Sequence, residues 1–170
     1  MPLRIVLALM ATLLLACGAV QEKVEQLDDL AKLAEAIDDP EAYAQNVESG
    51  CLAGDAEDCA SLGVHYAFGT YGRDKDYAKA HLYLGQSCDG GHAYGCHDLG
   101  VLYMYGRGVD ENPERAAELF SGTCPEIANS CHYMGDYTSG TKKGLQVDLE
   151  ASHDWYQKAC DAGSTSSCDR

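Results

Sequence analysis

Hydrophobic residues recur along the chain in two alternating helical patterns. In one pattern a small residue is followed four positions later by a large apolar residue, as in Ala80 and Leu84. In the other, Leu62, Gly63 and Tyr66 follow a cysteine at spacings of three, four and seven. These spacings place side chains on one face of an α-helix. The chain is therefore predicted to form pairs of helices, each with one buried stripe.

Both patterns return at a fixed period. Ala116 and Ser152 take the place of Ala80 in later copies, and Tyr137 comes one residue early in the last copy, which predicts a distorted helix there. Polar loops that contain glycine separate the two helices of a pair, at residues 69–76, 106–112 and 140–148. Such periodicity is typical of solenoids of helical hairpins. The last hairpin has no closing helix, so an unusual element or a partner is expected to cap it.

Eight of the nine cysteines form four pairs, and the first members of the pairs are 37, 36 and 36 residues apart. The pairs are Cys51/Cys59, Cys88/Cys96, Cys124/Cys131 and Cys160/Cys168. The spacing predicts one local disulfide per unit. A hairpin would also bring Cys59 beside Cys88, although that pairing leaves the first and last cysteines of the series unpaired. Zinc sites favour closer C-x2-4-C spacings, so no metal is expected.

The N-terminus has the form of an export signal. A short basic start and an apolar run lead to Ala16-Cys17, which resembles a bacterial lipobox and implies a lipid on the Cys17 thiol. The run is too short to span a bilayer. An ordinary cleaved signal, leaving a soluble periplasmic protein, is the alternative. The expected divisions are a signal peptide at 1–16, a linker at 17–21, a capping helix at 22–39 and the repeat array at 40–170.

The chain is strongly acidic, with 27 acidic against 12 basic residues and a net charge of −15. This charge repels phosphate backbones, so nucleic acid is excluded as a partner. It favours a cationic ligand. Together with the export signal, it predicts a periplasmic or outer-membrane lipoprotein of the bacterial cell envelope that contacts the membrane through its N-terminal lipid only.

The run Tyr103-x2-Gly106-x-Gly108-Val109, followed by Ala116, resembles the Sel1-like repeat. With a cysteine pair in each unit, the chain is similar to the Helicobacter cysteine-rich family. The resemblance implies an all-α protein, an α/α solenoid of disulfide-stapled Sel1-like (tetratricopeptide-like) hairpins. Some members of that family are described as penicillin-binding proteins or weak β-lactamases. A hydrolase acting on β-lactams or peptidoglycan amides is therefore the alternative function.

One string could belong to such a hydrolase. Ser139 and Lys142 form the S-x-x-K of penicillin-recognising serine enzymes, but they lie in a loop and the companion S-D-N and K-T-G are missing. A short string of this kind arises readily by chance. We therefore expect no catalytic residues and no cofactor, and a binding or scaffold protein is favoured over an enzyme.

Two histidines suggest a binding surface. His97 and His132 directly follow the second cysteine of consecutive units, and in the tetratricopeptide geometry this position faces the concave side of the array. The expected groove binds a protein, a peptide or a cell-wall fragment. Its predicted contacts are Tyr94, His97, Val101, Met104, Tyr105, Asn129, His132 and Asp136. Solvated surface histidines are the alternative, and two histidines without a third ligand do not make a metal site.

Overall fold

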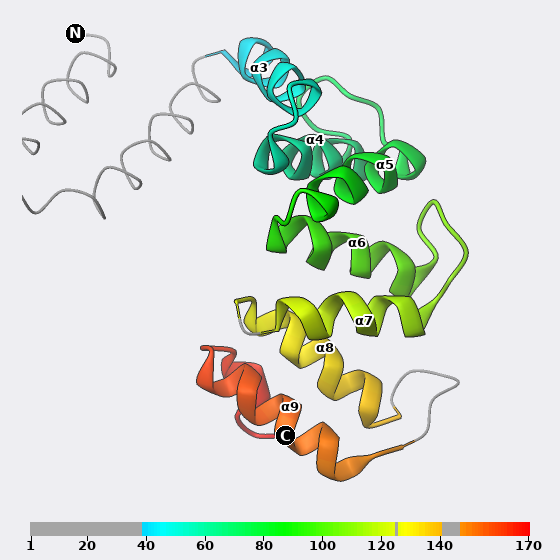
Figure 1. Ribbon diagram of the computed structural model, residues 1–170, viewed down its shortest axis with the longest axis vertical. Helices are drawn as coiled ribbons and strands as arrows, with labels where there is room; N and C mark the ends of the chain where they lie inside the picture. The colour runs from blue at the N-terminus through cyan, green and yellow to red at the C-terminus, as the bar shows by residue number, and fades with distance from the viewer. Residues whose placement is uncertain (1–38, 125, 141–146) are drawn as a thin grey trace, which may run out of the picture. The chain divides into compact units, whose positions relative to one another are not determined.

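The computed structural model describes residues 39–124, 126–140 and 147–170, and all its regular elements in these ranges are helices (Figure 1). They are α3 Pro40–Leu52, α4 Ala56–Phe68, α5 Tyr77–Asp89, α6 Ala93–Tyr105, α7 Pro113–Thr123, α8 Ala128–Thr138, α9 Leu149–Asp161 and the 3₁₀ helix η1 Thr165–Ser167. The predicted signal peptide, Cys17 and the linker lie outside the described residues, as does the capping helix apart from Asp39.

The chain divides into two compact units, residues 1–47 and 48–170, and the second contains the repeats. In this unit α4 pairs with α5, α6 with α7, and α8 with α9. Each second helix also packs on the first helix of the next pair, so the hairpins follow one another in chain order (Figure 1). The predicted all-α solenoid of stapled hairpins is confirmed. None of the described helices has the length and hydrophobicity needed to cross a membrane.

Local sequence signals set the ends of the helices. The carboxylates of Asp55 and Asp76 and the amide oxygen of Asn112 accept hydrogen bonds from backbone N–H groups in the first turns of α4, α5 and α7. Gly69 and Gly106 end α4 and α6 with positive φ angles of 71° and 60°. Glycine adopts this left-handed conformation without the steric penalty of a side chain. The polar loops therefore begin where the sequence placed them.

A helix glycine sets the closeness of each hairpin. A Cβ atom added to Gly100 would lie 2.8 Å from the ring of Phe120, and one added to Gly63 would lie 2.6 Å from Leu84. The third hairpin repeats the contact between Gly135 and Tyr156 at 2.6 Å. The large residue of the second helix thus packs directly against the backbone of the first.

Three of the four disulfides join the end of one helix to the start of the next. Cys88 near the end of α5 is bonded to Cys96 near the start of α6, and the Cys51–Cys59 and Cys124–Cys131 bridges hold the equivalent positions. Each bridge therefore links one hairpin to the next, rather than the two helices of one hairpin. In the chain-entropy description, closing so short a loop stabilises the fold by about 2.5 kcal/mol per bridge, less any strain in the folded state.

A short 3₁₀ turn stands where the next first helix would begin. The Cys160–Cys168 disulfide ties η1 back to α9. The guanidinium of Arg170 lies 5.7 Å from the centre of the Tyr156 ring. This tethered turn packs against the end of the last described hairpin.

The glycine contact can be tested by substitution. Gly100→Ala should lower the free energy of unfolding by about 1–2 kcal/mol, because crowding against Phe120 outweighs the better helix propensity of alanine. Gly85→Ala is the matched control, since nothing lies within 4 Å of its added Cβ atom. This control should raise the free energy of unfolding by up to about 1 kcal/mol. Urea denaturation followed by circular dichroism measures both, and equal effects of the two variants would contradict the close packing.

Candidate functional site

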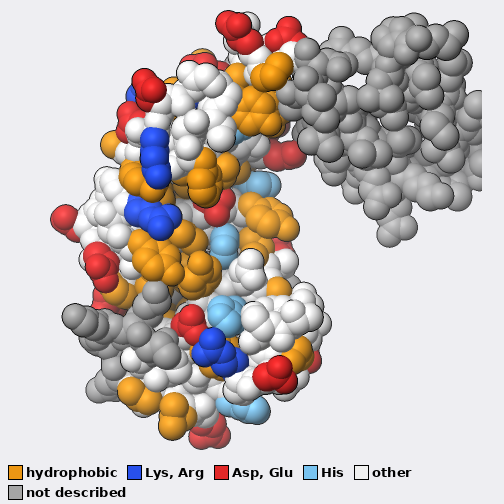
Figure 2. Space-filling view, turned by 180° about the vertical axis from the view of Figure 1, so that it is seen from behind, with side chains coloured by type: hydrophobic (Ala, Val, Ile, Leu, Met, Phe, Trp, Pro, Cys, Tyr) orange, Lys and Arg blue, Asp and Glu red, His pale blue; other side chains and the backbone are white. Residues whose placement is uncertain are grey.

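The first helices α4, α6 and α8 present side chains that the core does not require, and we call this side of the array the first-helix face. Figure 2 shows histidine side chains one above another along one face of the repeats, with hydrophobic and acidic side chains beside them. His97 and His132 occupy equivalent positions in α6 and α8, and both are half-buried. Each lies against the unit that follows it.

A chain of hydrogen bonds runs from His97 into the next repeat. Its Nδ1 atom lies 2.7 Å from the hydroxyl of Ser130, which lies 2.7 Å from the hydroxyl of Thr123. Thr123 in turn donates to the backbone carbonyl of Leu119 at 3.1 Å. Since a carbonyl can only accept, the order of donors is set along the chain: Thr123 accepts from Ser130, and Ser130 accepts from His97. The proton of His97 therefore sits on Nδ1.

This assignment leaves Nε2 of His97 as a hydrogen-bond acceptor. Burial lowers the pKa of His97 below its ordinary value of 6.5, so the ring is neutral at pH 7. The ring also contacts the aromatic rings of Phe120 and Tyr133, with centroids 5.5 and 5.8 Å away. His97 is therefore held rigidly between two repeats. This packing role differs from both alternatives drawn from the sequence, a solvated surface histidine and a residue that serves only to contact a ligand.

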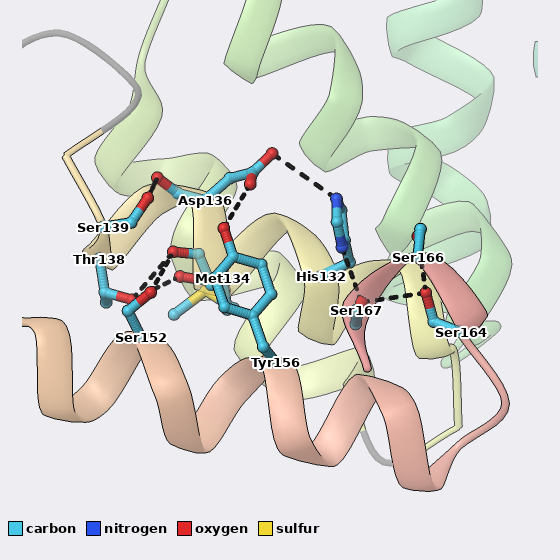
Figure 3. A network of polar contacts seen from close by, with 11 residues as sticks. His132, Met134, Asp136, Thr138, Ser139, Ser152, Tyr156, Ser164, Ser166 and Ser167 are labelled. Carbon is cyan, nitrogen blue, oxygen red and sulfur yellow. Dashed lines mark hydrogen bonds and ion pairs between the residues drawn. The ribbon is translucent and has the colours of Figure 1, made fainter. Parts of the chain in front are cut away.

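His132 repeats the arrangement one unit later. Its Nδ1 atom lies 2.7 Å from the hydroxyl of Ser167 in η1, and its Nε2 atom lies 3.8 Å from the carboxylate of Asp136 (Figure 3). The other oxygen of Asp136 accepts a hydrogen bond of 2.6 Å from the Tyr156 hydroxyl. The predicted contacts His132 and Asp136 are thus brought together, but both take part in the packing of the last hairpin.

These histidine–serine pairs do not form a hydrolase site. A nucleophilic serine must reach a substrate carbonyl, yet Ser130 is 0% and Ser167 is 2% exposed. Ser139, the serine of the S-x-x-K string, is half-buried and donates to the backbone carbonyl of Asp136, while Lys142 lies outside the described residues. The described residues therefore offer no support for serine-based hydrolysis.

The predicted contact Met104 is wrong. Its side chain is only 3% exposed and packs in the core with Ala117 and Phe120. Seven residues make nearly two turns, so Met104 lies on the same side of α6 as His97, and this side packs against Phe120 of α7. Val101 is half-buried and packs against the same cluster.

The remaining predicted contacts are accessible. Tyr94 is 60% and Tyr105 is 42% exposed, at opposite ends of α6, and Asn129 is exposed at the start of α8. Phe68, which the sequence analysis missed, is 67% exposed at the end of α4. It follows its second cysteine by nine residues, as Tyr105 does, so comparison of equivalent positions could have found it.

Asp98 is a carboxylate that the fold leaves poorly solvated. Burial raises its pKa from 3.8 to about 6, and the nearby His92 only partly offsets this effect. Within the described ranges, no side-chain or backbone donor forms a hydrogen bond with its carboxylate. A desolvated carboxylate without donors destabilises a fold at neutral pH. Its neighbours on this face are Val64, Phe68 and Val101, which line a narrow cavity with it.

A larger cavity lies away from these residues. It measures about 540 Å³ and is bounded by the Cys124–Cys131 bridge, Trp155 and Lys158, where the second helices end. A smaller hollow of about 240 Å³ occupies the equivalent place one repeat earlier, beside Cys96 and Leu119. Ser121 and Lys158 both line the larger cavity, and the Ser121 hydroxyl donates to the backbone carbonyl of Glu118 at 2.9 Å. Across the described part of the chain, no group of three or more metal-ligating residues comes together.

Three stretches of the chain match the Sel1 repeat, at residues 56–92, 93–121 and 128–164. Each stretch contains one of the helix pairs described above, and together they cover more than half of the chain. The chain belongs to the Sel1-repeat family. Repeats of this kind are scaffolds for protein–protein interaction. No curated protein matches the chain.

Solved structures confirm the fold. The chain is similar to c5321, a protective antigen of uropathogenic Escherichia coli, with 20% identity, a TM-score of 0.69 and coverage of 74% of this chain and 27% of that one. A Sel1 repeat protein from Oxalobacter formigenes gives 21% identity, a TM-score of 0.68 and coverage of 84% and 63%. Helicobacter pylori cysteine-rich protein B gives 22% identity and a TM-score of 0.56, with coverage of 74% of this chain and 95% of that one. The chain thus spans about a quarter of the c5321 chain, and these identities support the fold alone.

The disulfides of this Sel1-repeat protein also bear on its location. Disulfides persist in oxidising compartments such as the periplasm and are rare in the cytosol. Four bridges in one chain therefore indicate an oxidising location.

The half-buried carboxylate of Asp98 makes stability depend on pH. The folded-state pKa of Asp98, about 6, lies above its ordinary value of 3.8. The folded state therefore holds a proton that the unfolded state has already lost, and this contribution to stability falls as pH rises from about 4 to about 6. Asp98→Asn should raise the free energy of unfolding at pH 7 by on the order of 1–2 kcal/mol, and the gain should vanish below about pH 4.

The measurement is denaturation of both proteins at several pH values, because the difference between them removes the effects of other titrating groups, such as the buried His65. Asp110→Asn, which changes an exposed loop carboxylate, is the control. A gain that is independent of pH, or equal in the control, would contradict the assignment.

Proposed function

We propose that this protein binds a protein or peptide partner through its first-helix face. The observation that carries the proposal is the exposure of aromatic side chains at positions that the core does not use. Phe68 and Tyr105 stand at equivalent places in consecutive repeats, and Tyr94 lies at the other end of α6. Exposed aromatic residues are enriched among the residues that dominate binding energy.

The hydrogen bonds of His97 and His132 also support the first-helix face as the binding surface. The Nδ1 bonds of His97 and His132 tie each first helix to the following unit, so the side chains between them are held in fixed positions. A rigid surface loses little conformational entropy when it binds. The net charge of −15 favours a cationic partner, whose association should weaken as salt is added.

We also propose that the protein is a lipoprotein, anchored through Cys17 to a membrane of the cell envelope. The support is the basic start, the apolar run and the lipobox-like Ala16-Cys17 in the sequence. Mass spectrometry of the N-terminal peptide from native envelopes should find a lipid on Cys17. An unmodified N-terminus at Ala19 or Gln21 would instead mean a soluble, exported protein.

Partner binding is tested with a matched pair of double variants. Tyr94→Ser with Tyr105→Ser should weaken recovery of a specific partner from envelope extract, and should raise its dissociation constant at least tenfold once it is purified. Leu82→Ser with Leu149→Ser is the control, since these side chains are equally exposed but lie on the second helices α5 and α9. Circular dichroism confirms that the variants fold.

The outcome separates the two faces of the array. Loss of affinity in the tyrosine variant, with the leucine variant unchanged, supports the first-helix face. Equal affinity in the tyrosine variant and the wild type would overturn the proposal.

A further inference from the structure

A narrow furrow runs between the first helices α4 and α6. Val64 and Phe68 of α4 form one wall, Val101 of α6 lies opposite, and the carboxylate of Asp98 lies at the end nearer the start of α6. Tyr77 and Leu84 of α5 also line it, together with Ala67, Leu102 and, just beyond the other end of α6, Arg107. The furrow is therefore apolar along its walls and carries opposite charges at its two ends.

The neighbouring repeat explains why this furrow is open. Counted from the second cysteine, Tyr133 holds the position of Asp98, and Tyr105 holds that of Phe68. Tyr133 stacks on Phe120 at 4.8 Å and hydrogen-bonds to Tyr105, and burial together with Tyr105 raises its pKa. The aromatic ring of Tyr133 is thus packed against α7 and bonded to α6. At the equivalent position the shorter side chain of Asp98 lines a cavity beside α4.

The size of the furrow limits what can enter it. Its volume is about 50 Å³, whereas pockets for small molecules measure about 300–1,000 Å³. A volume of this order holds one or two water molecules or the end of one side chain. The apolar walls suit a methylene stem, and the carboxylate suits a cationic head group.

We propose that this furrow receives the end of a lysine or arginine side chain of the bound protein, with Asp98 accepting its charged head. This inference rests on the proposed function, because it names a contact on the same face. The ligand cation would supply the donors that the Asp98 carboxylate lacks in the described part of the chain. The two charged ends orient the side chain, since the guanidinium of Arg107, held over the rings of Tyr77 and Tyr105, repels a cation at the far end.

The test uses small blocked peptides and the folded, disulfide-bonded full chain at pH 7.5. Acetyl-Gly-Arg-Gly-amide should shift the backbone amide NMR signals of α4 and α6 with a millimolar dissociation constant. The same peptide with citrulline, which has the shape of arginine without its charge, should bind at least tenfold more weakly. Asp98→Asn should abolish this preference, and Asp98→Tyr should abolish binding of both peptides by filling the furrow.

The control variant Asp110→Asn should keep the preference for arginine, which excludes a general effect of net charge. Equal binding of arginine and citrulline peptides to the wild type, or an unchanged preference in Asp98→Asn, would overturn the furrow assignment. Such a failure is distinct from failure of the proposed function. That proposal is judged by partner affinity in the tyrosine variant, and neither Tyr94 nor Tyr105 lines the furrow.

Discussion

The contact between a helix glycine and a large side chain is the constraint on which the repeat unit depends. Gly63, Gly100 and Gly135 let Leu84, Phe120 and Tyr156 reach the backbone of the facing helix. This close approach fixes how the two helices of each hairpin cross, and therefore which sides of α4, α6 and α8 remain outside the core. The first-helix face consists of the sides of these three helices that this packing leaves outside the core.

Disulfides and histidine–serine hydrogen bonds both hold successive units together, and they do so at different places. The disulfides link the end of each second helix to the start of the next first helix. From the neighbouring position, His97 and His132 reach forward by a whole unit to Ser130 and Ser167. In a linear array each unit contacts only its neighbours, so such links couple the folding of one unit to that of the next. His97 and His132 therefore stabilise the packing of successive units. Only their remaining atoms, and the residues beside them, are available to a ligand.

Comparison of equivalent positions distinguishes structural from functional residues in this protein. Where a position packs, successive units carry residues that fill the same space, as Leu84, Phe120 and Tyr156 do. Where Asp98 stands in place of Tyr133, packing is given up and a desolvated carboxylate remains. A residue that lowers stability in one unit and is replaced by a packing residue in the next is a strong candidate for function.

The sequence alone determined the helices, their pairing and the family resemblance, because helical periodicity, capping residues and cysteine spacing are local signals that repeat three times or more. It also named Tyr94 and Tyr105 as candidate contacts, and both are exposed. Only the tertiary structure decided that the bridges join hairpins, that Met104 is buried, and that His97 bonds to Ser130. The furrow at Asp98 likewise could not be predicted from the sequence. These features depend on the rotation of one hairpin relative to the next, and the period of the chain does not encode that rotation.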